Sequence, residues 1–309
     1  MRILISRMSA LGDVVCSLPA AVSLREAFPD AEIHWMVDKR FRGIVDCCTA
    51  VNHTVELPKS LAAIKTKMQQ LGEFDLALDL QGLLKSALPV FMAQAKAKFG
   101  YHWQREGAAL LVPRVKPNPR SIHVVDQYLD VAVAAGGTLV NKGFGLQPKP
   151  EDLEIVQAKL HEAGLQPSTP FVLMNAGAGW VTKRWNPAHF AHVARAVQAK
   201  GFQVAFLGTE ADRPAFQEVI AHNVSAIDML GKTNVRQLVA LTSLARLHLG
   251  GDTGSTHLAA ALNIPAIGVY TLTKPDRSCP YGQREHCRSL DPVEVTTLAL
   301  HLLENTDAK

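Results

Sequence analysis

The sequence has few aromatic residues, little net charge and no long apolar run. Phe, Trp and Tyr make up 6% of its 309 residues, and the formal net charge is +4. So small a charge is not typical of nucleic-acid binders, and we expect no nucleic-acid partner. No stretch reaches the roughly 18 uninterrupted apolar residues that span a bilayer, and the chain opens on a strand pattern without a basic leader. We therefore expect a cytoplasmic protein with no transmembrane segment.

Cysteine is also scarce. The five cysteines are odd in number and form neither repeated CxxC pairs nor a pattern with histidine at metal-ligand spacing. This excludes a disulfide framework and a zinc ribbon. We expect reduced thiols and no metal or cofactor. The residues concerned are Cys16, Cys47, Cys48, Cys279 and Cys287.

The composition is that of a folded protein, with 48% apolar and 19% charged residues. The length favours two domains of about 150 residues, each able to bury its own core. Residues 1–150 carry 18 basic and 13 acidic side chains, whereas 151–309 carry 14 and 15. This asymmetry fits an acidic partner that meets the N-terminal half, and it equally fits ordinary surface scatter.

Both halves alternate short apolar runs with helical patterns, which is typical of βαβ units on a parallel sheet. A Gly- and Pro-rich stretch at 136–150 separates them, and we place the domain boundary between 148 and 149. The sequence thus predicts two α/β domains, 1–148 and 149–309. Expected strands lie at 2–6, 32–37, 53–58, 75–80, 170–176, 202–208, 226–230, 247–251 and 265–270. Expected helices lie at 12–28, 39–48, 60–71, 82–93, 121–135, 151–163, 187–200, 212–222, 234–245, 255–262 and 292–303.

Ligands of open α/β sheets bind at the carboxyl ends of strands, so the loops there are the candidate sites. In the first loop, SRMSALGD, Asp13 either favours the start of a helix or acts as a general base towards a hydroxyl. In the loop DLQGLLKS, a carboxylate, an amide and the Lys85 ammonium follow a strand. They indicate either a polar-ligand site or a capped helix with a solvated lysine.

Two loops of the second half have features of anion sites. NAGAGWVTKRW combines glycines, whose amides can approach a phosphate, with the cations Lys183 and Arg184. It lacks P-loop spacing, and Thr182 interrupts a dinucleotide fingerprint. GGDTGSTH places hydroxyls, helix N–H groups and His257 at a helix start. Capping by Asp252 or Thr253 explains part of this pattern, but not the glycines and imidazole together.

With these loops in order, the chain resembles the ADP-heptose:lipopolysaccharide heptosyltransferases, inverting enzymes of the GT-B fold. The resemblance rests on SALGDVV, DLQGLLKSA, the KRW-N-P loop and GGDTGSTHLAAAL, and covers essentially the whole length. It implies two Rossmann-like domains with parallel sheets that face an interdomain cleft. The N-terminal domain would bind the acceptor and the C-terminal domain the ADP-sugar. DLQGLLKSA and HWQRE look more like the type I enzyme, which adds heptose to a Kdo residue of the lipopolysaccharide inner core.

The resemblance also implies roles for individual residues. Asp13 would be the general base, and Lys183 would neutralise the diphosphate of the leaving ADP. The other expected donor-binding residues are Gly177, Ala178, Arg184, Glu210, Asp252, Thr253, Gly254 and His257. The expected acceptor-binding residues are Arg7, Ser9, Gly12, Gln81, Lys85, Arg120 and His123.

The partners implied are ADP-heptose and a Kdo–lipid A acceptor, met by a monomer at the surface of the inner membrane. The last helix, at about 292–305, is expected to pack back on the N-terminal domain. Two segments depart from the family pattern: YTLTKP at 270–275 lacks a Gly-Pro turn, and 59–67 is basic without arginine.

Other functions remain open at this stage. A type II heptosyltransferase or a transferase for another surface glycan would share these motifs, and a non-catalytic nucleotide-binding module would share the fold. An incomplete GxGxxG after the first strand argues against a nicotinamide oxidoreductase.

Overall fold

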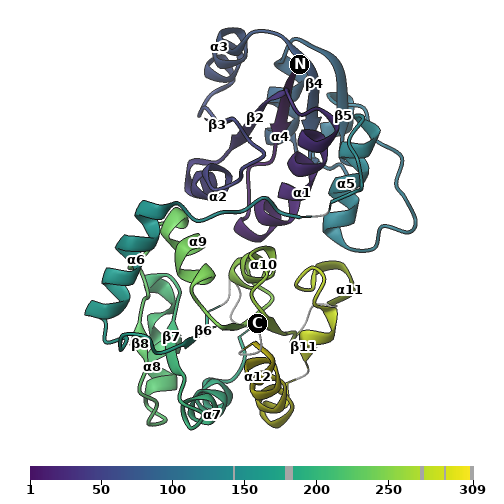
Figure 1. Ribbon diagram of the computed structural model, residues 1–309. Helices are drawn as coiled ribbons and strands as arrows, with labels where there is room; N and C mark the ends of the chain where they lie inside the picture. The colour runs from purple at the N-terminus through teal and green to yellow at the C-terminus, as the bar shows by residue number, and fades with distance from the viewer. Residues whose placement is uncertain (142, 178–183, 272–274, 289, 307–309) are drawn as a thin grey trace. The chain divides into compact units, whose positions relative to one another are not determined.

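The computed structural model describes residues 1–141, 143–177, 184–271, 275–288 and 290–306 (Figure 1). The chain divides into two compact units, Met1–Gln147 and Pro148–Lys309. Each unit is an α/β body built around its own parallel sheet.

The first unit contains a five-stranded parallel sheet in the order β3-β2-β1-β4-β5. Its strands are β1 (Arg2–Ser6), β2 (Glu32–Val37), β3 (His53–Glu56), β4 (Phe74–Asp79) and β5 (Ala95–Gly100). Its helices are α1 (Leu11–Ala27), α2 (Arg42–Asp46), α3 (Leu61–Leu71), α4 (Leu84–Met92) and α5 (Val124–Ala134), with 3-10 turns η1 (Lys39–Phe41) and η2 (Ala108–Leu110).

Alternation along the strands explains how this sheet is covered, because successive side chains point to opposite faces. Leu4 of β1 and Ala77 of β4 join one buried cluster with Ile64 of α3 and Val90 of α4. Helices α1 and α5 pack against each other along their lengths (Figure 1). The predicted strand at 32–37 is confirmed to the residue, whereas β5 was not predicted.

The second unit contains a six-stranded parallel sheet in the order β11-β10-β9-β6-β7-β8. Its strands are β6 (Phe171–Asn175), β7 (Gln203–Phe206), β8 (Ile227–Asp228), β9 (Leu247–Gly251), β10 (Ala266–Val269) and β11 (Cys287–Arg288). Its helices are α6 (Pro150–Glu162), α7 (Pro187–Gln198), α8 (Arg213–Ile220), α9 (Val235–Ser243), α10 (Gly254–Ala261), α11 (Pro275–Ser278) and α12 (Pro292–Thr306), with 3-10 turns η4 (Glu210–Asp212) and η5 (Arg284–His286).

Two apolar layers cover the two faces of this sheet. Val172 and Phe206 pack with residues of α7, α8 and α12, whereas Leu173 and Ala205 pack with residues of α6 and α9. Figure 1 shows α12 beside α7, and its Leu303 lies in the core that they share. The expected packing of this last helix on the first unit stays a prediction.

Within the described part of the chain, none of the helices has the length and apolar character that a bilayer crossing needs. None of the five cysteines, all of which the structure describes, forms a disulfide.

Candidate functional site

In each sheet the strand order reverses at one point, and ligands of open α/β sheets bind beside such points. In the first unit the chain runs outward from β1 through β2 to β3, then returns to β4 and β5 on the other side. Strands β1 and β4 are therefore the neighbours at the reversal. The corresponding pair in the second unit is β6 and β9. The loops after these four strands contain most of the predicted site residues.

Arg7, directly after β1, joins the two loops of the first reversal point. Only 5% of its side chain is exposed. Its Nη1 donates to the Leu80 carbonyl at 2.8 Å, and its guanidinium lies 4.9 Å from the centroid of the Tyr128 ring. Its Nη2 lies 2.9 Å from Oδ1 of Asp13. The arginine thus fixes the predicted base relative to the β4 loop.

Burial by itself would lower the pKa of Arg7, but charge interactions, with Asp13 and Asp79 among the groups concerned, outweigh it and raise that pKa above its usual value. The buried guanidinium therefore remains charged. Burial also raises the pKa of Tyr128, so its phenol stays neutral beneath the arginine.

Asp13 lies in the first turn of α1, where a negative charge interacts favourably with the helix dipole. Besides the Arg7 contact at Oδ1, its Oδ2 accepts the Ala10 N–H at 3.2 Å. Nearly half of the side chain, 48%, is nevertheless exposed. The carboxylate is thus held in one orientation and still accessible to a substrate hydroxyl.

The predicted acceptor residues Ser9, Gln81 and Lys85 gather around the same loops. Gln81 Oε1 accepts the Met8 N–H at 2.9 Å, and Lys85 Nζ donates to the Ser9 hydroxyl at 3.1 Å. Gly12 immediately precedes Asp13 in α1. The structure therefore brings Arg7, Ser9, Gly12, Gln81 and Lys85 together with the proposed base.

The other two predicted acceptor residues lie before and at the start of α5. Arg120 is exposed, and its backbone N–H donates to Asn118 Oδ1 at 3.1 Å. His123 is buried, and its Nδ1 accepts the Val125 N–H at 3.1 Å as the cap of α5. This nitrogen of His123 is thus used in helix capping.

Asp79, which ends β4, shapes the turn that carries Gln81. It is fully buried, and its Oδ1 accepts the N–H groups of Gln81 and Gly82 at 2.9 and 3.1 Å. Burial raises the pKa of the Asp79 carboxyl. Gly82 has φ +73°, and a Cβ there would lie 2.6 Å from the Trp103 carbonyl. Only glycine fits this turn without displacing its neighbours.

At the second reversal point, Asn175 and Ser255 connect the loops after β6 and β9. Asn175 Nδ2 donates to the Ser255 hydroxyl at 2.9 Å, and its Oδ1 accepts the Gly177 N–H at 2.9 Å. Ser255 Oγ also lies 3.0 Å from Thr253 Oγ1. Ser255 is one of the hydroxyls that the sequence placed in the GGDTGSTH anion site, whereas Asn175 was not among the predicted site residues although it begins a loop that the sequence singled out.

The start of α10 gathers the four donor residues predicted in GGDTGSTH. Thr253 is the N-cap, and Gly254 is the first helical residue. His257 Nε2 lies 3.7 Å from Asp252 Oδ1. The first N–H groups of a helix have no acceptor within the helix and carry a partial positive charge, so this helix start can bind an anion.

Of the donor residues predicted in the loop after β6, the structure describes Gly177 and Arg184. Arg184 Nη2 is 3.9 Å from Asp212 Oδ1, and a Cβ on Gly177 would lie 2.2 Å from the same oxygen. An alanine at 177 would therefore require the Asp212 carboxylate to move. Ala178 and Lys183 lie outside the described residues.

Glu210 is paired with an arginine. Its two carboxylate oxygens accept from Arg213 Nε and Nη2 at 2.6 and 2.8 Å, and Arg213 also contacts Asp228 at 2.8 Å. Hydrogen bonding to Arg213 lowers the pKa of Glu210. A ribose hydroxyl at Glu210 would therefore meet a carboxylate that already binds a guanidinium.

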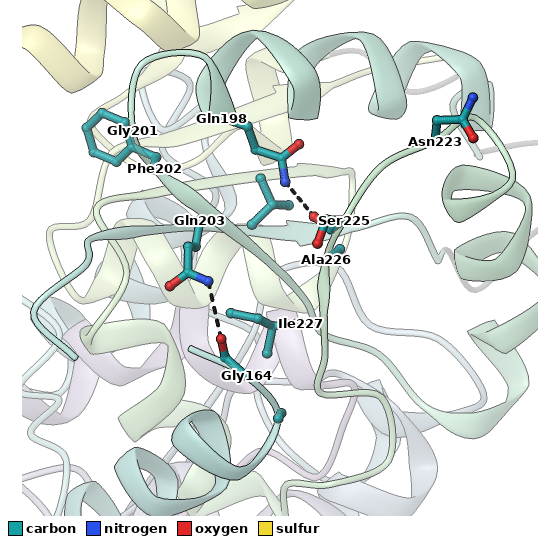
Figure 2. Close-up of a pocket in the computed structure, with 11 residues that line it drawn as sticks. Gly164, Gln198, Gly201, Phe202, Gln203, Asn223, Ser225, Ala226 and Ile227 are labelled. Carbon is teal, nitrogen blue, oxygen red and sulfur yellow. Dashed lines mark hydrogen bonds between the residues drawn. The ribbon is translucent and has the colours of Figure 1, made fainter. Parts of the chain in front are cut away.

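A pocket of about 540 Å³ lies elsewhere in the second unit, beside the first residues of β7 and β8 (Figure 2). Its glutamine amides already bind backbone carbonyls: Gln203 donates to Gly164 and Gln198 to Ser225. No acidic, basic or histidine side chain is among the described residues that line it. The pocket offers no group for acid–base chemistry and lies at the opposite end of the strands from the reversal-point loops.

Comparison with known proteins identifies a family. A model described as glycosyltransferase family 9 (heptosyltransferase) matches residues 64–298. The lipooligosaccharide heptosyltransferase 2 of Haemophilus ducreyi is 27% identical over 313 residues, covering 92% of this chain and 87% of that protein. The lipopolysaccharide heptosyltransferase 1 of Escherichia coli is 27% identical over 308 residues, 94% of each chain.

Solved structures share the fold. The E. coli ADP-heptose heptosyltransferase II superposes with a TM-score of 0.84 at 22% identity, over 99% of this chain and 100% of that one. The E. coli heptosyltransferase WaaC with ADP superposes with a TM-score of 0.76, also at 22% identity and with the same coverage. The GT-B fold class predicted from the sequence is confirmed.

Proposed function

The chain belongs to glycosyltransferase family 9, the heptosyltransferases, and from this premise we propose that it transfers heptose from ADP-heptose to a Kdo residue of the lipopolysaccharide inner core. The donor is proposed because the solved relatives are described as an ADP-heptose enzyme and as an enzyme with ADP. The Kdo step is proposed because DLQGLLKSA and HWQRE resemble the type I enzyme.

The observation that carries the proposal is the Arg7–Asp13 pair. A buried guanidinium orients a carboxylate that is still 48% exposed, at a strand reversal where ligands bind. A general base needs such a fixed but accessible oxygen within hydrogen-bond reach of the hydroxyl that it deprotonates.

The proposed reaction is a single displacement with inversion. Asp13 takes the proton of the acceptor hydroxyl while that oxygen bonds to the anomeric carbon of heptose. The bond from this carbon to the diphosphate oxygen breaks, and ADP leaves with the electron pair. No second carboxylate is needed, because no glycosyl-enzyme intermediate forms. General-base catalysis of this kind contributes about 10²- to 10⁴-fold to the rate.

For the donor, we assign the diphosphate to the start of α10 and the sugar to Asp252. The N–H groups of the first turn, with Thr253, Gly254 and His257, would stabilise the negative charge that develops on the leaving ADP. Lys183 would add a cation from the loop after β6, and Glu210 would contact the ribose. Gly177, Ala178 and Arg184 complete the proposed donor loop.

For the acceptor, we assign the anionic groups of Kdo–lipid A to the basic residues of the first unit. Lys85 is exposed and donates to the Ser9 hydroxyl, in the loop that leads to Asp13, and Arg120 and His123 would extend the contact along the acceptor. We propose that the protein works at the inner-membrane surface, because its proposed acceptor is a membrane glycolipid. We also propose that it works as a monomer.

A type II reaction is the second candidate, because a heptosyltransferase 2 and a heptosyltransferase 1 match this chain at the same identity, 27%. Mass spectrometry separates the two steps. The purified chain is incubated with ADP-heptose and either Kdo–lipid A or the same acceptor already carrying one heptose. The proposal predicts addition of one heptose to Kdo–lipid A, whereas addition to the heptosylated acceptor alone would show the type II reaction.

A further inference from the structure

Glu32, His34 and His53 form a cluster in the first unit that the transfer reaction does not use. His34 and His53 are direct partners in the parallel pairing of β2 with β3. Glu32 stands two residues before His34 in β2, so both side chains project from the same face of the sheet. One ligand atom from each of the three residues lies within 4.8 Å of the others.

The distances within the cluster approach those of a coordination shell. Glu32 Oε1 lies 2.8 Å from His53 Nε2 and 3.3 Å from His34 Nε2. In a tetrahedral zinc site with bonds of about 2.0–2.2 Å, neighbouring ligand atoms are about 3.3 Å apart. The two imidazole centroids are 4.6 Å apart, and the exposed His53 ring has room to turn when it binds an ion.

We propose that Glu32, His34 and His53 bind one divalent transition-metal ion of the zinc type, with water in the fourth position. Two imidazoles and one carboxylate are a ligand set that zinc accepts when the site has an open position. Among the residues that the structure describes, this is the one group of three or more His, Cys, Asp or Glu side chains with such spacing.

Arg2 of β1 orients the carboxylate. Its Nε donates to Glu32 Oε2 at 2.9 Å, which leaves Oε1 directed at the two histidines. Its Nη1 is fixed by the carbonyls of Leu71 and Glu73 at 2.7 and 2.8 Å. Hydrogen-bonded partners of this kind hold metal-ligating carboxylates in place. Hydrogen bonding to Arg2 also lowers the pKa of Glu32 and keeps it ionised.

Arg2 also sets a limit on the affinity. Its Nη2 lies 3.3 Å from His34 Nε2, and the bound cation replaces that contact while facing the guanidinium charge. We therefore expect weaker binding than in a His₂Glu site without a neighbouring arginine.

The position of the site indicates a structural role. Arg2, Glu32 and His53 are the first residues of their strands, so the cluster lies at the end of the sheet opposite the Arg7–Asp13 loops. Strand β3 is an edge strand of four residues that pairs with β2 alone. An ion bound by His53 and by the two β2 residues would hold the edge strand β3 to β2. Solvent can reach it through His53, whose side chain is 52% exposed.

The test uses the tag-free full chain, stripped with a chelator and then titrated with Zn²⁺ by calorimetry and with Co²⁺ by visible absorption. The matched variants are His53→Ala, which removes an exposed ligand, and His161→Ala, which removes an exposed histidine on α6. Wild type and His161→Ala should each bind one ion, give the visible bands of tetrahedral Co²⁺, and melt at a higher temperature with Zn²⁺. His53→Ala should bind at least about tenfold more weakly and show no zinc-dependent melting shift.

Glu32→Gln, which keeps the shape of the side chain, should behave like His53→Ala and serves as the second ligand variant. An unchanged affinity in either ligand variant, or no stoichiometric binding by wild type, overturns the proposal. After metal removal, the turnover of ADP-heptose should stay within about twofold of its value before removal. The metal-site proposal and the proposed transfer reaction are therefore tested independently.

Discussion

Asn175 donates a 2.9 Å hydrogen bond to Ser255 and so connects the loop after β6 with the start of α10, where the strand order of the second unit reverses. Asn175 also holds the Gly177 N–H through its side-chain oxygen. The pair therefore positions both loops assigned to the donor.

Ser255→Ala should raise the dissociation constant for ADP about threefold to tenfold, because a hydrogen bond contributes about 0.5–1.5 kcal/mol and its loss frees the donor loops. Calorimetry with ADP measures the effect. The control is Ser243→Ala, which removes a hydroxyl bonded to Ala240 within α9. Ser243→Ala should lower the free energy of unfolding about as much as Ser255→Ala does, and it should leave the ADP affinity unchanged. Equal ADP affinity in wild type and Ser255→Ala would contradict the assignment.

Gly82→Ala should destabilise the first unit more than Gly107→Ala. Both glycines have positive φ, +73° and +79°, so alanine is strained at either position by about 1–2 kcal/mol. At Gly82 the new Cβ also meets the Trp103 carbonyl, whereas nothing lies within 4 Å at Gly107. We expect a further loss of about 1–3 kcal/mol in the unfolding free energy of Gly82→Ala, measured with urea. Equal losses would show that the close contact relaxes freely.

His248 should make the second unit sensitive to acid. It is fully buried in β9, and neither ring nitrogen has a hydrogen-bond partner within the described part of the chain. Burial lowers the pKa of His248 to about 3. Below its ordinary pKa of about 6.5 the unfolded chain binds a proton that the folded chain does not, so stability is lost as pH falls from there towards 3.

The loss approaches about 1.4 kcal/mol per pH unit, or about 2 kcal/mol between pH 6.5 and 5. His248→Leu keeps an apolar side chain of similar size and removes the titrating group. Urea unfolding of both proteins at pH 7 and pH 5 measures the difference. The variant should lose about 2 kcal/mol less than wild type over this interval. Equal losses of unfolding free energy in the two proteins would refute the claim that His248 causes the acid sensitivity.

Periodicity predicted most of the fold, because the buried strands are continuous apolar runs bounded by turns. It missed β5, AKAKFG, whose alternating lysines conceal an edge strand. It also missed β11, a strand of two residues that is too short for any pattern. It predicted a strand of five residues at 226–230, of which only two form β8. The apolar pattern is longer than the strand because Met229 also packs in the core, although its backbone is outside the strand.

The site could be predicted where one loop contains several functional residues, as in GGDTGSTH. Contacts between distant segments could not be. Tyr128, more than 100 residues after Arg7, lies under the guanidinium, and no local pattern links the two. Asp79 was singled out with its loop, but only its burial shows that it organises the turn instead of facing solvent.

The role of Asp13 as base is tested most directly by the transfer rate of Asp13→Asn, measured as heptose added to Kdo–lipid A at saturating ADP-heptose. The control is Asp30→Asn, an exposed carboxylate beyond the other end of α1. We predict a rate at least about 100-fold below wild type for Asp13→Asn, with ADP affinity within about twofold and the control at the wild-type rate. A wild-type transfer rate in Asp13→Asn would contradict the mechanism.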